Sequence, residues 1–117
     1  MTLEDYRAFC LSLPHVTEGF PFDANTLVFK VGGKMFALMD AESFDGINLK
    51  CNPDEAVELR ESYSGITGGF HMNKKHWNTI YLHTDVDDKM LLALTKISYD
   101  IVFDGLPKKI KNELTLR

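Results

Sequence analysis

Nine consecutive residues, from His71 to Thr79, concentrate the side chains of this chain that are best suited to binding a ligand. They include two lysines, two histidines, two asparagines and the only tryptophan. Lysines pair with phosphates, an indole stacks on a base or an aromatic ligand, and an asparagine such as Asn78 hydrogen-bonds to a base edge. The surrounding stretch, from Ser62 to Thr84, contains no Asp or Glu. The segment is therefore a cationic, aromatic patch on an acidic protein.

An ordinary structural interpretation competes with this one. Lys74 and Lys75 fit a solvated hairpin turn, and Trp77 fits a core or a site beneath a loop. Lys34 and Lys50 lie on or beside expected strands, where lysines commonly mark the solvent side of a sheet and discourage unwanted strand pairing. The lysines line one positive surface only if the strand order brings them together.

The sequence offers no recognisable catalytic or metal-binding pattern. It lacks a Gly-x-Ser-x-Gly elbow and a phosphate-cradling loop followed by Lys-Ser/Thr. His71 and His76 flank an expected turn, but no Cys-x-x-Cys pair, helical His-x-x-x-His pair or nearby carboxylate completes a metal site. Cys10 and Cys51 are isolated, so we expect buried, reduced thiols. We expect no enzymatic activity, no metal and no cofactor.

Composition indicates one globular domain spanning residues 1–117. The chain is 44% hydrophobic and 26% charged, with a formal net charge of −4. This balance argues against a generic phosphate-backbone binder and predicts weak, salt-sensitive affinity if a local patch binds nucleic acid. No apolar run approaches the ~20 residues that a membrane span requires, and the N-terminus lacks signal-peptide features. We expect a cytoplasmic monomer with no membrane contact.

The local patterns predict an order of helix, three strands, helix, two strands and helix. A Thr2-capped helix ends at Leu13-Pro14, and a loop follows over residues 15–25. Gly32-Gly33 separates two strand-like runs, which predicts a hairpin with Phe29 opposite Phe36 and Leu27 opposite Leu38. The remaining expected elements are a strand at 47–51, a helix from Asn52-Pro53, strands within 66–72 and 76–82, a helix at 86–104 capped by Thr84 or Asp85, and a short C-terminal helix.

These elements predict an α+β fold with a mainly antiparallel sheet covered on one face. Side chains alternate along a strand. If Ile80 faces the helices, Trp77 and Tyr81 therefore face the other way.

Several strings resemble the MmcQ/YjbR family of small bacterial proteins. They are Phe20-Pro21-Phe22-Asp23, residues 28–37, Asn48-Leu49-Lys50-Cys51, the segment from His71 to Thr79, Ser98-Tyr99-Asp100 and Leu106-Pro107-Lys108-Lys109. The resemblance implies a two-layer fold of the secretion-chaperone type. It also implies DNA binding through a double-wing arrangement of hairpins, a family label that rests on structural analogy.

The leading hypothesis is a non-catalytic DNA-binding protein that contacts the phosphate backbone through hairpin lysines. The candidate nucleic-acid-binding residues are Lys34, Lys50, Lys74, Lys75, His76, Trp77 and Asn78. One alternative is a protein-interaction or chaperone-like module, which uses an open sheet face that carries Met35, Met39, Trp77 and Tyr81. Another is a small-molecule pocket closed by the loop at 15–25, with Phe20 and Phe22 over the sheet.

Overall fold

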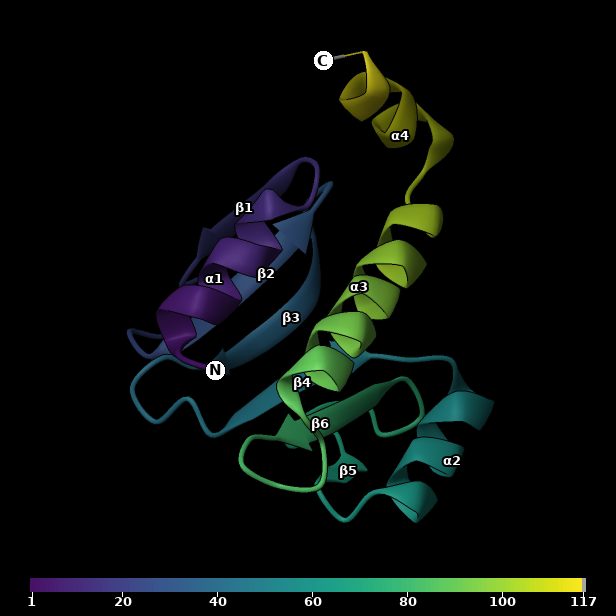
Figure 1. Cartoon of the computed structure of the whole chain (residues 1–117). Coiled ribbons are helices and arrows are strands. Elements are labelled where there is room, and N and C mark those ends of the chain that lie inside the picture. The colour runs from purple at the N-terminus through teal and green to yellow at the C-terminus, as the bar shows by residue number, and fades with distance from the viewer. Residues whose placement is uncertain (117) are drawn as a thin grey trace.

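A six-stranded antiparallel sheet with helices on one face forms the architecture (Figure 1). The structure, a computed structural model, describes residues 1–116. The elements in chain order are α1 (Leu3–Ser12), β1 (Val16–Gly19), β2 (Thr26–Val31), β3 (Lys34–Asp40), β4 (Gly46–Lys50), α2 (Pro53–Ser62), β5 (Ile66–Gly68), β6 (Trp77–Tyr81), α3 (Asp88–Asp104) and α4 (Lys108–Thr115). The strand order is β1-β2-β3-β4-β6-β5. The predicted α+β class is confirmed.

The main core lies between the sheet and the helices α1 and α3. It is centred on fully buried side chains, among them Tyr6, Phe29, Phe36, Ile47 and Leu91. Burying an aliphatic or aromatic side chain of this kind contributes about 1.5–3 kcal/mol. The helix α2 covers the far end of the same face, against β5 and β6. This packing leaves the opposite face of the sheet without a helix among the described residues (Figure 1).

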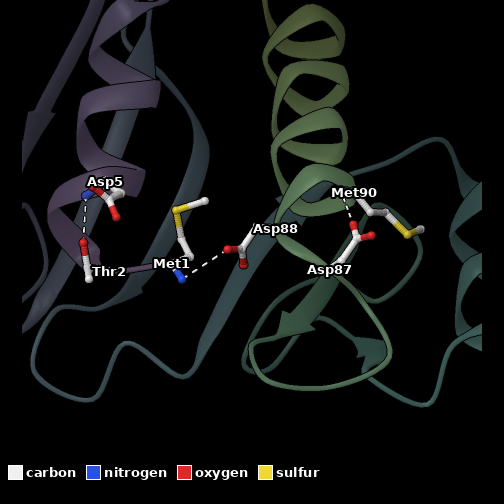
Figure 2. Close-up of polar contacts among 6 residues, drawn as sticks. All are labelled: Met1, Thr2, Asp5, Asp87, Asp88 and Met90. Carbon is white, nitrogen blue, oxygen red and sulfur yellow. Dashed lines mark hydrogen bonds and ion pairs between the residues drawn. The ribbon is translucent and has the colours of Figure 1, made fainter.

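Side-chain caps fix where α1 and α3 begin. The Thr2 hydroxyl accepts a hydrogen bond from the Asp5 amide at 3.1 Å, as predicted, and Asp87 accepts one from Met90 at 2.7 Å. Figure 2 shows both caps and the ion pair at 3.2 Å between the Met1 amine and Asp88, which joins the two helix starts. The predicted cap at Thr84 or Asp85 is wrong, because the Asp85 carboxylate accepts hydrogen bonds from the amides of residues 64 and 65 instead.

The segment predicted as a loop at 15–25 contains the edge strand β1. Val16 pairs with Val31, and Gly19 pairs with Val28. The strand has only four residues and its side chains are exposed or half-buried. Its pairing therefore rests on backbone hydrogen bonds, which leave no mark in the hydrophobic pattern. The strands before α2 accordingly number four rather than the predicted three.

A β-bulge in β3 shifts the predicted register of the central hairpin. Val31 pairs with Lys34 as expected, but Phe29 pairs with Ala37 and Leu27 with Met39. The predicted pairs Phe29–Phe36 and Leu27–Leu38 are therefore wrong. The extra residue in β3 lets both Phe36 and Ala37 enter the main core and turns Leu38 to the helix-free face.

Candidate nucleic-acid interface

The segment from His71 to Thr79 contains the expected turn before β6 and the first residues of β6 itself. The Asn73 side chain accepts a hydrogen bond from the Lys75 amide at 2.9 Å, which closes this turn. The Lys74 ammonium donates a hydrogen bond to the Gly69 carbonyl at 3.0 Å. The backbone carbonyl of Lys74 accepts a hydrogen bond from the Arg60 guanidinium at 2.9 Å. Lys75 is exposed and His76 is half-buried. Lys74 is thus held against its own loop, whereas Lys75 faces solvent.

Trp77 and Asn78 lie on opposite faces of β6, and both are buried. Trp77 is 8% exposed and packs with Val28 and Leu38 on the helix-free face, as the strand alternation predicted. Asn78 is 1% exposed, and its amide donates to the carbonyl of Ala56 in α2 at 3.2 Å. The structure therefore places the predicted base-contacting side chain of Asn78 beneath α2 and away from the surface. The burial of Trp77 leaves its ring unavailable for full stacking.

Lys34, Lys50 and Trp77 come together at one end of the sheet. They line a hollow of about 310 Å³ between the strands and the last turns of α3 at Val102 and Gly105. Lys50 lies directly opposite Trp77 in the β4–β6 pairing, and Lys34 begins β3. The strand order therefore brings two of the predicted lysines to one site.

These lysines carry no ion pair within residues 1–116. The ion pairs there join the Met1 amine to Asp88, Arg7 to Glu18 and Lys96 to Asp100. None of the predicted lysines (Lys34, Lys50, Lys74 and Lys75) takes part. Two unpaired ammonium groups beside one hollow create a local positive potential that a phosphate can neutralise.

The short helix α4 adds lysines to the same end of the molecule. Its anchor is Leu106, which is 5% exposed and lies over Gly32 at the tip of the β2–β3 hairpin. A β-carbon placed on Gly32 would come within 2.5 Å of the Leu106 side chain. The exposed Lys108 and Lys109 follow directly. From the sequence, these lysines fit a helix C-terminus, where they suit the helix dipole. Their position beside the hairpin tip follows from the contact between Leu106 and Gly32, which lie far apart in the sequence.

Many of the acidic side chains gather at the opposite end of the sheet. This end contains the start of α1, the turn from β3 to β4 and the loop before α3 (Figure 1). The acidic residues there are Glu4, Asp5, Asp40, Glu42, Asp45, Asp85, Asp87 and Asp88. The carboxylates are thus distributed unevenly. The end with Lys34 and Lys50 also carries Asp54 and Glu55 at the start of α2 and Asp104 at the end of α3.

The cysteines are free and buried, which confirms that prediction. Burial raises the pKa of the Cys10 thiol to about 12 and also raises the pKa of Cys51, so both are protonated at neutral pH. Within residues 1–116 no group of three or more His, Cys, Asp and Glu side chains is placed to hold a metal ion. None of the described helices has the length and apolarity to cross a membrane.

Three comparisons relate this arrangement to known proteins. The family model described as YjbR matches residues 11–101. Among curated proteins, the chain is 36% identical to Uncharacterized protein YbdF of Escherichia coli O157:H7 over 107 residues, which is 91% of this chain and 88% of the relative. It is 28% identical to Uncharacterized protein YjbR of Escherichia coli K12 over 110 residues, covering 93% of each chain.

Solved structures share the fold closely. The crystal structure of Deinococcus radiodurans protein DR2400, with the domain DUF419, superposes with a TM-score of 0.90 at 40% identity, covering 97% of this chain and 88% of that one. A crystal structure of a Pseudomonas syringae protein gives a TM-score of 0.75 at 26% identity, covering 87% of this chain and 99% of that one. These matches agree with the antiparallel sheet and the helix order described above.

Proposed function

The chain belongs to the YjbR family, and for this member we propose weak binding of nucleic acid through the phosphate backbone. The binding surface is the basic end, defined as Lys34, Lys50, Lys108 and Lys109. The observation that carries the proposal is that Lys34 and Lys50 line one hollow and have no carboxylate partner within residues 1–116. Such groups can exchange solvent counterions for phosphates at little structural cost.

Charge segregation explains how an acidic protein can bind a polyanion. The carboxylates at the opposite end of the sheet repel a phosphate chain, whereas the basic end attracts it. The repulsion and attraction together orient the protein during encounter, and the effect weakens as salt screens it. The net charge of −4 limits the affinity. We therefore expect binding that is weak and strongly dependent on salt.

Because Trp77 and Asn78 are buried, the proposed site has few side chains that could recognise individual bases. Base recognition requires side chains that reach base edges or offer an open aromatic face. Asn78 is covered by α2, and Trp77 exposes only 8% of its surface. The surface therefore supplies positioning contacts to phosphates and little discrimination among sequences.

Fluorescence anisotropy with labelled single-stranded and duplex DNA tests the proposal. At low salt the dissociation constant should lie at about 10–100 µM, within the range of non-specific binding. A plot of the logarithm of the dissociation constant against the logarithm of the salt concentration should have a slope of about 3–4. Each phosphate that the protein neutralises contributes about 0.9 to this slope. Absence of binding to either DNA at several hundred micromolar protein would remove the proposal.

Charge-neutral variants locate the contact. The double variant Lys34→Gln, Lys50→Gln should lower the magnitude of the salt slope by about 2, because two phosphate contacts are lost. The matched control is Lys89→Gln, which removes an exposed lysine near the acidic start of α3. Because the control removes one charge and the double variant removes two, a loss of binding free energy half as large in the control would show that overall charge, rather than the basic end, governs binding.

The same titration distinguishes the alternative of a protein-interaction module. The surface predicted for such a module loses Met39, which packs in the main core, whereas Met35 and Trp77 lie together on the helix-free face. A peptide bound mainly through apolar contacts would show little dependence on salt. Binding of a peptide with little dependence on salt, and no binding of DNA, would favour this alternative.

A further inference from the structure

A second hollow lies on the helix-free face of the sheet, towards its acidic end. Its volume is about 430 Å³, within the range of sites for small ligands. Asn48, Thr79 and Tyr81 from β4 and β6 contribute to the lining, together with Phe70 and His71 from the loop after β5. The pocket predicted beneath Phe20 and Phe22 is not this one, because neither residue lines it and both are exposed.

The aromatic side of this hollow is fixed by backbone contacts. The Phe70 amide donates to the Thr79 hydroxyl at 2.9 Å, and that hydroxyl donates to the Asn48 side-chain oxygen at 2.5 Å. The Phe70 and His71 rings contact each other, with centroids 4.0 Å apart. Nevertheless, 62% of the Phe70 side chain remains exposed. The Phe70 backbone is therefore held beside the hollow, and its ring stays largely open to solvent.

Asp40 and Asp45 supply the acidic groups of the lining, which includes no lysine or arginine. One oxygen of Asp40 accepts hydrogen bonds from the amides of Glu42 and Ser43, and one oxygen of Asp45 accepts from the Ser43 hydroxyl. Within residues 1–116 neither carboxylate forms an ion pair. The second oxygen of each remains available to a ligand that carries hydrogen-bond donors.

We propose that this hollow binds a small organic amine with a flat apolar body. The ammonium group pairs with the carboxylates of Asp40 and Asp45, where the surrounding acidic end also favours a cation. The flat body rests against the rings of Phe70 and Tyr81, whose faces attract both apolar surface and positive charge. The chemistry of the lining selects against the anions that the basic end attracts.

This inference is independent of nucleic-acid binding. The residues that line the two hollows do not overlap, and they lie towards opposite ends of the sheet. A failure of DNA to bind would leave the amine site untouched, and the reverse also holds.

Tryptamine and indole-3-acetate provide matched probes, because they share a ring system and carry opposite charges. Titrations followed by ¹H–¹⁵N NMR spectra should show tryptamine shifting the amides of Gly46, Asn48, Phe70 and Thr79. A ligand of this size is expected to bind with a dissociation constant of about 1 mM. Indole-3-acetate should bind at least about tenfold more weakly, since it cannot pair with the carboxylates. Equal affinities, or shifts centred elsewhere, would overturn the proposal.

Two variants separate the charge from the aromatic contact. Asp45→Asn keeps an acceptor for Ser43 but removes a charge, and should weaken tryptamine binding about three- to tenfold. Phe70→Ala should weaken both probes, because it removes the exposed ring. Asp54→Asn, an exposed position on α2, is the matched control and should leave the affinity unchanged. A loss in Asp54→Asn equal to that in Asp45→Asn would also overturn the proposal.

Discussion

Ser98 joins three elements through one buried hydroxyl group. Its oxygen donates a hydrogen bond to the Phe36 carbonyl at 2.6 Å and accepts one from the Lys50 amide at 2.8 Å. Phe36 is the extra residue of the bulge in β3, where the regular ladder is locally disrupted. The Ser98 hydroxyl of α3 therefore supplies the hydrogen-bond partner that the bulge takes away from the sheet. This contact lies beside the site formed by Lys34 and Lys50.

Ser98→Ala should destabilise the fold by about 2–3 kcal/mol. The substitution removes the hydrogen-bond partner of the buried Phe36 carbonyl and of the partly buried Lys50 amide. Polar groups left without a partner in a protein interior destabilise the fold. Urea unfolding measures the change. Ser62→Ala, at an exposed position on α2, is the control and should change stability by less than about 0.5 kcal/mol. A similar small effect at Ser98 would contradict the assigned role.

At the residue scale, the sequence predicted the face of the sheet to which a side chain points better than it predicted the burial of that side chain. Strand alternation correctly placed Trp77 on the face opposite Ile80. It could not predict the burial of Trp77, because Val28 and Leu38, which pack against it, belong to strands far away in the sequence. The bulge also moved Leu38 to that face, and no local pattern marked it.

At the scale of elements, strong local signals succeeded and weak pairings failed. The Gly32-Gly33 hairpin and the Thr2 cap were confirmed because their chemistry lies within a few residues. The edge strand β1 was missed because each of its residues pairs with a β2 residue that lies 9 to 15 positions away in the sequence. Docking of α4 on the hairpin tip likewise requires Leu106 to meet Gly32, a contact between distant parts of the chain.

Gly32→Ala and Gly33→Ala form a matched pair that tests the docking of α4. Both glycines have positive φ, at 59° and 82°, so alanine costs about 1 kcal/mol in backbone strain at either position. Only a β-carbon at Gly32 meets Leu106, whereas nothing lies within 4 Å at Gly33. Gly32→Ala should therefore speed amide hydrogen exchange in α4 more than Gly33→Ala does. Equal exchange in both variants would contradict the contact.

The loop before α3 makes a pH-dependent contribution to stability. The Gly65 and Ser64 amides donate to the Asp85 carboxylate and lower its pKa below the ordinary value of 3.8. A carboxyl whose folded-state pKa is depressed stabilises the fold above its unfolded pKa, and the benefit is lost as pH falls through the folded pKa. Asp85→Asn should therefore be less stable than the native chain at pH 7.

The difference between Asp85→Asn and the native chain should shrink as the pH falls from about 4 towards 2. Urea unfolding at several pH values measures it. A difference that stays constant over the whole range would show that the negative charge of Asp85 does not contribute.

At the scale of the whole molecule, eight carboxylates gather at one end of the strands, while Lys34 and Lys50 lie at the other. This property depends on the order β1-β2-β3-β4-β6-β5 and on the direction of each strand, neither of which the sequence alone reveals. Composition gave a net charge of −4 and suggested an unfavourable partner for DNA. The fold places Lys34 and Lys50 at one end and Asp40 and Asp45 towards the other.

Mapping the DNA contact by NMR on ¹⁵N-labelled protein tests the central claim most directly. Titration with a short duplex at low salt should shift the amides of Lys34, Lys50 and Lys109, and leave those of Asp45 and Asp87 unchanged. The shifts should disappear as salt is raised, because the contacts are to phosphates. Shifts centred on the acidic end, or none at protein and DNA concentrations of about 1 mM, would contradict the account.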